Sequence, residues 1–316
     1  MLIDYRAKLS VEARGRLDRI REVLRAIDPR IRALIADHRE KSTRWMPHEL
    51  LPWGQGRDFN GVPWSADQSP LRPGVALALE TNLLTEDNLP YYHAQIARVA
   101  EEDSALHEWN GIWTSEESVH ALVLRDYVHL TRALDPRRLE QNRAAVMQKG
   151  FGRRFADPLE LLAYTTAQEL ATRISHLAVG RKAGDPVLTR ILTMVARDEN
   201  FHYIFYRSVV KLILEAAPEL MLPAIMKQLY SFTMPGDGFD RFEERSAVIA
   251  AEGIFSVHEY RDSVVRPILV HWGIDKLRGL SAEAERVRER ILKLDRVLER
   301  MIDRQQKAAR IPSTAR

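Results

Sequence analysis

One arrangement of glutamate and histidine occurs twice in this 316-residue chain, and the duplication constrains the fold more than any other feature. In each copy a lone glutamate precedes a Glu-x-x-His motif. The first copy consists of Glu86, Glu117 and His120, and the second of Glu169, Glu199 and His202. The lone glutamate lies 31 residues before its motif in the first copy and 30 in the second. We interpret the two copies as matching halves of one structure.

This spacing is typical of a metal site inside a helical bundle. Residues three apart share one face of a helix, so each Glu-x-x-His motif can hold an ion from one side. A turn flanked by two helical arms of about 14 residues, each roughly 20 Å long, brings the lone glutamate level with its motif. One Glu from each of two helices and Glu-x-x-His from each of the other two is the inventory of a two-metal bundle. Such carboxylate and imidazole donors suit iron or manganese. A single Glu-x-x-His is common without metal; the equally spaced pair favours metal.

Composition excludes several other classes of protein. The chain has no cysteine, which rules out disulfides, thiolate nucleophiles and cysteine-ligated clusters. Its formal charge of +3 does not indicate a nucleic-acid partner. No apolar run reaches the roughly 20 residues that a transmembrane helix needs, and the N-terminus lacks the apolar core of a signal peptide. We therefore expect a soluble, cytoplasmic protein.

Helix-forming residues dominate the chain, so the predicted fold class is all-α. We expect a single domain over 1–316: N-terminal helices and an ordered loop over 1–74, a four-helix core over 75–210, flanking helices over 211–302 and a basic tail over 303–316. Periodicity predicts helices over 9–40 (broken near Asp28-Pro29) and around 75–105, 107–134, 136–150 and 240–272, with a heptad seam over 281–302. Asp157-Pro158 is expected to open a helix that ends near Gly180–Gly184, and Asp185-Pro186 to open the next. The loop over 42–74 holds Trp45, Trp53 and Trp64, which predicts an ordered segment.

Several strings resemble the soluble acyl-[acyl-carrier-protein] desaturases, both the plant stearoyl type and its actinobacterial relatives. The strings are Thr85-Glu86-Asp87-Asn88-Leu89-Pro90, Trp113-Thr114-Ser115-Glu116-Glu117-Ser118-Val119-His120, Gln168-Glu169-Leu170-Ala171-Thr172-Arg173-Ile174-Ser175-His176 and Asp198-Glu199-Asn200-Phe201-His202. The similarity runs from about residue 40 to 300. It implies a ferritin-like di-iron bundle with additional flanking helices.

The resemblance also implies residue roles. The six iron ligands of the family fall on Glu86, Glu117, His120, Glu169, Glu199 and His202. Thr172 matches a threonine beside the oxygen-binding face, and Asp198 matches an aspartate that orients a ligand histidine, here His120. Trp45 matches a tryptophan on an electron route through that pair. The implied reaction inserts a double bond into a fatty acyl chain on acyl carrier protein, in fatty acid biosynthesis, with O₂, two iron ions and electrons from ferredoxin. The implied assembly is a homodimer.

Some features leave alternatives open. Ser118-Val119 stands where the plant enzymes have Asn-Arg, and the loop around 150–158 is shorter than theirs. The same ligand set occurs in di-iron hydroxylases or oxidases and in ferritin-like ferroxidases. Candidates to line an acyl tunnel, or simply to pack in the core, are Met234, Phe239, Phe242 and Phe255. Candidate docking pairs are Arg137-Arg138, Arg153-Arg154 and Arg181-Lys182, and His93, His107, His129 and His176 are expected at the surface or supporting the ligands.

Overall fold

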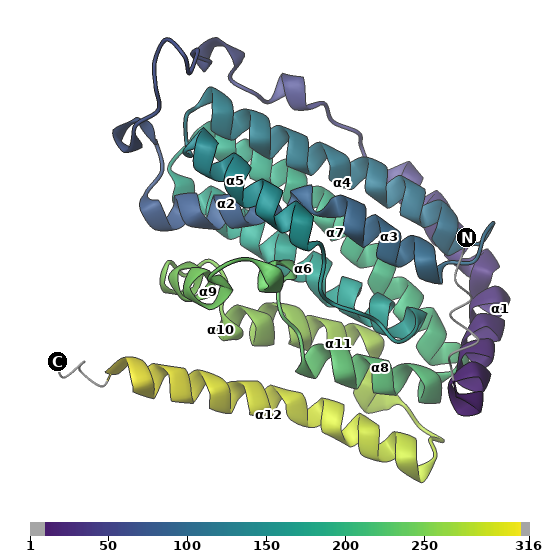
Figure 1. The fold of residues 1–316 in the computed structure, drawn as a ribbon. Helices are drawn as coiled ribbons and strands as arrows, with labels where there is room; N and C mark the ends of the chain where they lie inside the picture. The colour runs from purple at the N-terminus through teal and green to yellow at the C-terminus, as the bar shows by residue number, and fades with distance from the viewer. Residues whose placement is uncertain (1–9, 311–316) are drawn as a thin grey trace.

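Four helices form the centre of the molecule in a computed structural model that describes residues 10–310 (Figure 1). They are α2 (Pro73–Asp87), α4 (Ala105–Leu130), α6 (Pro158–Ala183) and α7 (Pro186–Ala216). Helix α2 packs against α4 and α6, α4 packs against α7, and α6 lies along α7. The described residues contain no strand, so the predicted all-α bundle is confirmed.

The ends of α6 and α7 follow from local sequence. Asp157 caps α6 by accepting hydrogen bonds from the backbone N–H groups of Leu159 and Glu160, and Asp185 caps α7 through that of Leu188. Both helices have proline in the first turn, where its missing N–H costs nothing. Gly184, at φ +68°, ends α6 in the left-handed conformation. The Asp-Pro signals therefore place both helices correctly.

The predicted break in the first helix is wrong, because α1 (Val11–Lys41) continues through Pro29. A proline inside a helix removes one backbone hydrogen bond. The buried stripe of Ile27, Ile31 and Ile35 compensates, since α1 packs along α4 and α7. The carboxylate of Asp28 also accepts a hydrogen bond from the first backbone N–H of α4, at Ala105 (2.7 Å).

The segment predicted as one helix over 75–105 is two helices, so that prediction is also wrong. Helix α2 ends at Asp87, and α3 (Leu89–Val99) begins after a single non-helical residue, Asn88. Pro90 in the first turn of α3 has no N–H to continue the backbone hydrogen bonds of α2. As a result Glu86 lies in the last turn of its helix rather than in the middle.

Flanking helices cover the centre on its outer sides (Figure 1). They are α5 (Pro136–Lys149), α8 (Pro218–Tyr230), α9 (Phe242–Ala251), α10 (Val257–Glu259), a π-helical turn over Tyr260–Val265, α11 (Arg266–Trp272) and α12 (Ala282–Arg310). The expected helix over 240–272 is thus divided, because Gly253 at φ +64° ends α9. In α12 the heptad seam buries Ile291, Leu294 and Leu298.

The loop between α1 and α2 is ordered by short 3₁₀ turns over Pro47–Glu49, Trp53–Gln55 and Ala66–Gln68. Trp45 is buried, and the indole N–H of Trp64 donates to the carbonyl of Arg132 (3.0 Å). Trp53, in contrast, is 54% exposed. Further 3₁₀ turns lie at Pro235–Gly238 and Ile274–Lys276. Among the helices over residues 10–310, none is long and apolar enough to cross a membrane.

Candidate metal centre

The six predicted ligands meet at the centre of the four-helix bundle. The six side chains come from the four helices α2, α4, α6 and α7, and none is more than 5% exposed. Their oxygen and nitrogen atoms form two overlapping groups, in each of which the atoms lie within 4.8 Å of one another. The first group is Glu86, Glu117, His120 and Glu199; the second is Glu117, Glu169, Glu199 and His202.

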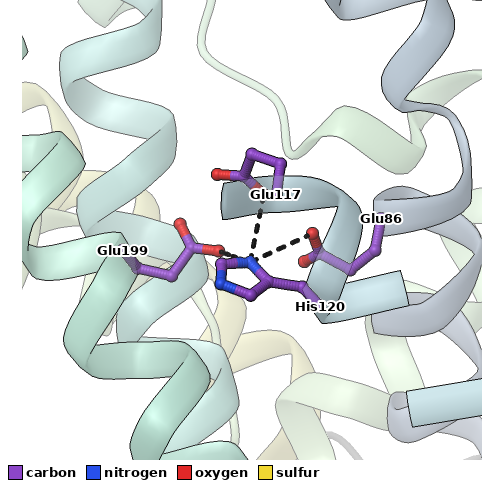
Figure 2. Close-up of side chains that lie close together, drawn as sticks. All are labelled: Glu86, Glu117, His120 and Glu199. Carbon is purple, nitrogen blue, oxygen red and sulfur yellow. Dashed lines mark hydrogen bonds and ion pairs between the residues drawn. The ribbon is translucent and has the colours of Figure 1, made fainter. Parts of the chain in front are cut away.

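Glu117 and Glu199 belong to both groups, so they lie between the two halves. Each half then adds one histidine and one lone glutamate. Three carboxylates surround the ring nitrogen Nδ1 of His120 in the first half (Figure 2). The cluster therefore has the composition that the duplicated sequence motif predicts.

Both histidines turn the same nitrogen inward. Nδ1 of His202 faces an oxygen of Glu117 at 2.9 Å and one of Glu169 at 3.5 Å. Nδ1 of His120 lies 3.1 Å from Glu117 and 3.5 Å from Glu199. A metal ligand must present an unprotonated nitrogen, so the proton of each neutral ring belongs on Nε2.

The buried carboxylates of the cluster lie so close together that burial and mutual repulsion shift the pKa values of its residues. Burial, together with the carboxylates of Glu117 and Glu169, raises the pKa of Glu199 well above its ordinary value. Burial also raises the pKa of Glu169. Although burial opposes charge on both rings, the surrounding carboxylates raise the pKa of His120 and of His202 well above the ordinary value for histidine. Protons therefore take the place of cations in the metal-free cluster.

Asp198 and Trp45 extend the first half of the cluster outward. Nε2 of His120 lies 3.3 Å from Oδ2 of Asp198, and the indole N–H of Trp45 donates to the same oxygen at 2.7 Å. The indole and imidazole rings are nearly parallel, with an angle of 8° and centroids 6.3 Å apart. A surface depression of about 570 Å³ opens over Trp45 and Asp198.

The second half has a matching extension that the sequence analysis missed. Nε2 of His202 lies 2.9 Å from Oε2 of Glu116, and Nε2 of His38 lies 3.0 and 3.1 Å from the two oxygens of that carboxylate. Burial opposes the charge of Glu116, but the hydrogen bonds from the two histidines lower its pKa to about 2. A sequence signal was present: Glu116 precedes Glu117 as Asp198 precedes Glu199.

Each lone glutamate is also held by a residue from another helix. The indole N–H of Trp113 donates to Oε1 of Glu169 (3.1 Å), and Nε2 of His176 lies 3.0 Å from Oε1 of Glu86. His176 is fully buried and supports a predicted ligand, in agreement with one of the two roles expected for it. Its position seven residues after Glu169 places both on one face of α6.

Thr172 lies on the face of α6 that carries Glu169 but does not join the cluster. It is 3% exposed. Its hydroxyl donates to the backbone carbonyl of Gln168 (2.7 Å) and accepts from the side-chain amide of the same residue (3.0 Å). The expected role of Thr172 beside the oxygen-binding face stays a prediction.

A mostly apolar cavity of about 500 Å³ has Thr85, the neighbour of Glu86 in the sequence, in its wall, but none of the six ligands lines it. Its walls come from α2, α6, α8, the segment 232–236, α9, the segment 255–257, the π-helical turn and α12. Met234, Phe242 and Phe255 line it, whereas Phe239 packs in the core. At its inner end stand Asn82, Thr85 and Ser175; Asn82 is hydrogen-bonded to Ser175 (3.1 Å) and to His176 (3.2 Å), the residue that supports Glu86.

Comparison with known proteins identifies the family. The sequence matches the fatty acid desaturase family over residues 19–316. It is 34% identical over 294 residues to a putative acyl-[acyl-carrier-protein] desaturase, DesA1, of Mycobacterium tuberculosis, covering 90% of this chain and 87% of the relative. The chain belongs to the fatty acid desaturase family. It is therefore an enzyme, an oxidoreductase of the desaturase type.

A plant relative and a solved structure extend the comparison. The chain is 28% identical over 286 residues to the chloroplast stearoyl-[acyl-carrier-protein] 9-desaturase of Ricinus communis, covering 84% of this chain and 72% of the relative. An X-ray structure of the putative acyl-ACP desaturase DesA2 of Mycobacterium tuberculosis matches with a TM-score of 0.68 and 22% identity. It covers 81% of this chain and 96% of DesA2, and shows that the two share the fold.

Proposed function

We propose that this desaturase acts on fatty acyl chains carried by acyl carrier protein and inserts a cis double bond as part of fatty acid biosynthesis. In this proposal two iron ions occupy the cluster, O₂ is the co-substrate and a ferredoxin supplies electrons. The reaction balances as one acyl chain, one O₂, two electrons and two protons giving the mono-unsaturated chain and two molecules of water. The observation that carries the proposal is the buried carboxylate–histidine cluster beside an apolar cavity in a chain of this family.

The donor atoms of the cluster fit two iron ions. Five buried atoms make no well-aligned hydrogen bond within the described part of the chain, although the last two lie 2.9 Å apart: both carboxylate oxygens of Glu199, Oε2 of Glu169, Oε1 of Glu117 and Nδ1 of His202. Buried polar atoms are seldom left unpaired, and here all of them belong to the residues of the second group. Four carboxylates also balance the charge of two divalent cations. Glu86, Glu117 and His120 with Glu199 would hold one ion, and Glu169 and His202 with the shared carboxylates the other.

The cavity supports an acyl substrate. Met234, Phe242 and Phe255 give it an apolar wall suited to methylene groups, and the polar atoms of Asn82 and Ser175 at its inner end bond to one another. An acyl chain entering from the α9 and α12 side would therefore reach Asn82, which is linked to Glu86 through His176, without uncovering unpaired polar groups. The bound irons supply the O₂ chemistry that removes hydrogen, and the cavity holds two adjacent methylenes near them and excludes water.

The roles of the residues around the cluster are part of the proposal. Asp198 accepts from Nε2 of His120 and so keeps Nδ1 free for the metal. A donor protein docked at the depression over Trp45 would be one hydrogen bond from Asp198, which supports Trp45 as an electron entry point. We retain Thr172 as a residue that acts beside the bound O₂.

Exposed basic pairs are the candidate docking surface for the carrier protein. Arg153 is committed to internal contacts, because its guanidinium lies 4.7 Å over the ring of Tyr164 and donates to the carbonyl of Ser231. The exposed pairs Arg137-Arg138 and Arg181-Lys182 remain candidates for docking an acidic carrier protein. We also propose that the chain is one domain and forms a homodimer. Equilibrium sedimentation with only the 36.4 kDa chain at micromolar concentration would contradict the dimer.

Product analysis separates this function from its rivals. Purified protein is incubated with O₂, reduced ferredoxin and saturated C16 or C18 acyl carrier thioesters, and the products are measured by mass spectrometry. We expect a product two mass units lighter than the substrate. A product sixteen units heavier would identify a hydroxylase. No acyl product together with accumulation of ferric iron would identify a ferroxidase, which the apolar cavity disfavours.

A further inference from the structure

The two histidines of the cluster are held from outside in the same way. Nε2 of each ring meets a carboxylate that stands one residue before the opposite Glu-x-x-His motif: Asp198 for His120 and Glu116 for His202. Each carboxylate in turn meets an aromatic N–H group from the N-terminal part of the chain, Trp45 or His38. The arrangement repeats across the two halves of the cluster as the ligands themselves do.

We propose that Glu116 and His38 are positioning residues for the second metal, with Glu116 fixing the orientation of His202 and His38 fixing the orientation of Glu116. This inference rests on the proposed function only in that it needs a metal at His202. The resemblance to the desaturases assigns no role to either residue. Under this proposal, the metal affinity of the second half of the cluster depends on Glu116 and His38 and not on Asp198.

The geometry supports both links. The carboxylate of Glu116 receives three contacts of 3.1 Å or less, one from His202 and two from His38. Hydrogen bonds in which the acceptor is ionised are short and strong, so they hold the carboxylate in one orientation. With Nε2 of His202 engaged by Glu116, the free nitrogen of the ring is Nδ1, which faces Glu117 and Glu169.

His38 is placed to resist movement. It projects from α1, is 5% exposed, and packs edge-on against Trp109 at 4.9 Å and Phe201 at 5.9 Å between ring centroids. The imidazole therefore cannot swing away from Glu116 without leaving its aromatic neighbours. Glu116 itself is partly exposed and lines the surface depression beside Asp198, so it needs a partner to stay in place.

Stepwise metal binding tests the first link. The full chain, stripped of metal with a chelator, is titrated with Co²⁺ without O₂ and followed by visible absorption and metal analysis. The unaltered protein is expected to bind two ions. Loss of a residue that orients a ligand lowers metal affinity by about 10–100-fold. Glu116→Gln should therefore weaken one of the two steps by that factor and leave the other unchanged, Asp198→Asn should weaken the other, and the double variant both.

Glu108→Gln is the matched control. Glu108 lies on the same helix, lines the same depression and pairs with Arg32 and Arg39, but it contacts no histidine. Its substitution should leave both steps unchanged. Two unchanged steps in Glu116→Gln, or Glu116→Gln and Asp198→Asn weakening the same step, would overturn the inference. If the unaltered chain binds no Co²⁺, the proposed metal centre itself is wrong.

A double-mutant cycle tests the second link. His38→Leu removes the donor and should weaken the same step as Glu116→Gln, by a smaller factor. It should have no further effect in the Glu116→Gln background and its full effect in the Asp198→Asn background. His38→Gln keeps an N–H donor and should restore most of the affinity. Additive effects of His38→Leu and Glu116→Gln would overturn the role of His38. If His38→Leu does not fold, His38→Phe keeps an aromatic ring against Trp109 and Phe201 without an N–H group, and an unweakened step in that variant would overturn the role of His38.

Discussion

The indole N–H of Trp113 is expected to make a measurable contribution to stability through the buried carboxylate of Glu169. Glu169 is fully buried, its Oε1 accepts from Trp113 at 3.1 Å, and its Oε2 makes no hydrogen bond within the described residues. A hydrogen bond to a charged group contributes about 1.5–3 kcal/mol. Trp113→Phe removes the donor and retains an aromatic ring, so the free energy of unfolding of the metal-free protein should fall by this amount plus the cost of lost volume.

Trp109→Phe separates the two costs. Trp109 lies one turn earlier on the same helix, is fully buried like Trp113, and stacks on Phe205 with centroids 3.6 Å apart. Within residues 10–310 its indole N–H has no hydrogen-bond partner. Both variants lose the same part of a side chain, but Trp109→Phe also removes a buried N–H group without a partner, which offsets part of its loss. The difference between the two losses is therefore an upper limit for the bond to Glu169.

Equilibrium unfolding in urea, followed by far-UV circular dichroism in the presence of a chelator, measures both variants. We expect Trp113→Phe to lose about 1.5–3 kcal/mol more than Trp109→Phe at pH 8. The difference should shrink in acid, where Glu169 takes up a proton and the bond no longer serves a carboxylate. Equal losses in the two variants at pH 8 would refute the reasoning.

Three further outcomes are expected. The pKa values of His120 and His202 are raised in the folded protein, so their contribution to the stability of the metal-free protein is fully present below about pH 6.5 and is lost as pH rises through the folded values. The urea midpoint of the metal-free protein should therefore fall as pH rises, and a midpoint that rises with pH would contradict this. Adding Fe²⁺ should release protons and stabilise the protein more at high pH. Asp198→Asn should slow turnover by about 10–100-fold even when iron is added in excess, so that the weakened step is still filled; unchanged turnover with ferredoxin would exclude the proposed role of Asp198. Ala250→Trp, in the wall of the cavity, should abolish acyl binding measured by calorimetry while two metal equivalents remain bound, and unimpaired acyl binding would place the substrate elsewhere.

The sequence by itself determined the parts of this protein that depend on local geometry. Residues three apart lie on one helical face whatever the surroundings, so the pairing of Glu117 with His120 and of Glu199 with His202 could be predicted from the sequence alone. The Asp-Pro starts of α6 and α7 could also be predicted, because helix capping involves residues that are neighbours in the sequence. The all-α fold and the composition of the cluster followed from these local rules and the repeated spacing.

Resemblance to a family added what local rules do not provide. Asp198 and Trp45 are 153 residues apart, and their hydrogen bond could be expected only from matching strings in related enzymes. The equivalent bond between Glu116 and His202 was missed, although the duplication carries the signal in the acid before each motif. Treating the two copies as fully symmetric, supporting residues included, would have found it.

Only the tertiary structure decided which side chains from distant helices meet. His38 reaches Glu116, and Trp113 reaches Glu169, because of the rotation and axial position of α1, α4 and α6, which no short stretch of sequence encodes. Packing also kept α1 helical through Pro29 against its local preference. The apolar cavity has the same origin, since its walls come from segments far apart in the sequence, whose separation is set by the volumes of all the side chains between them.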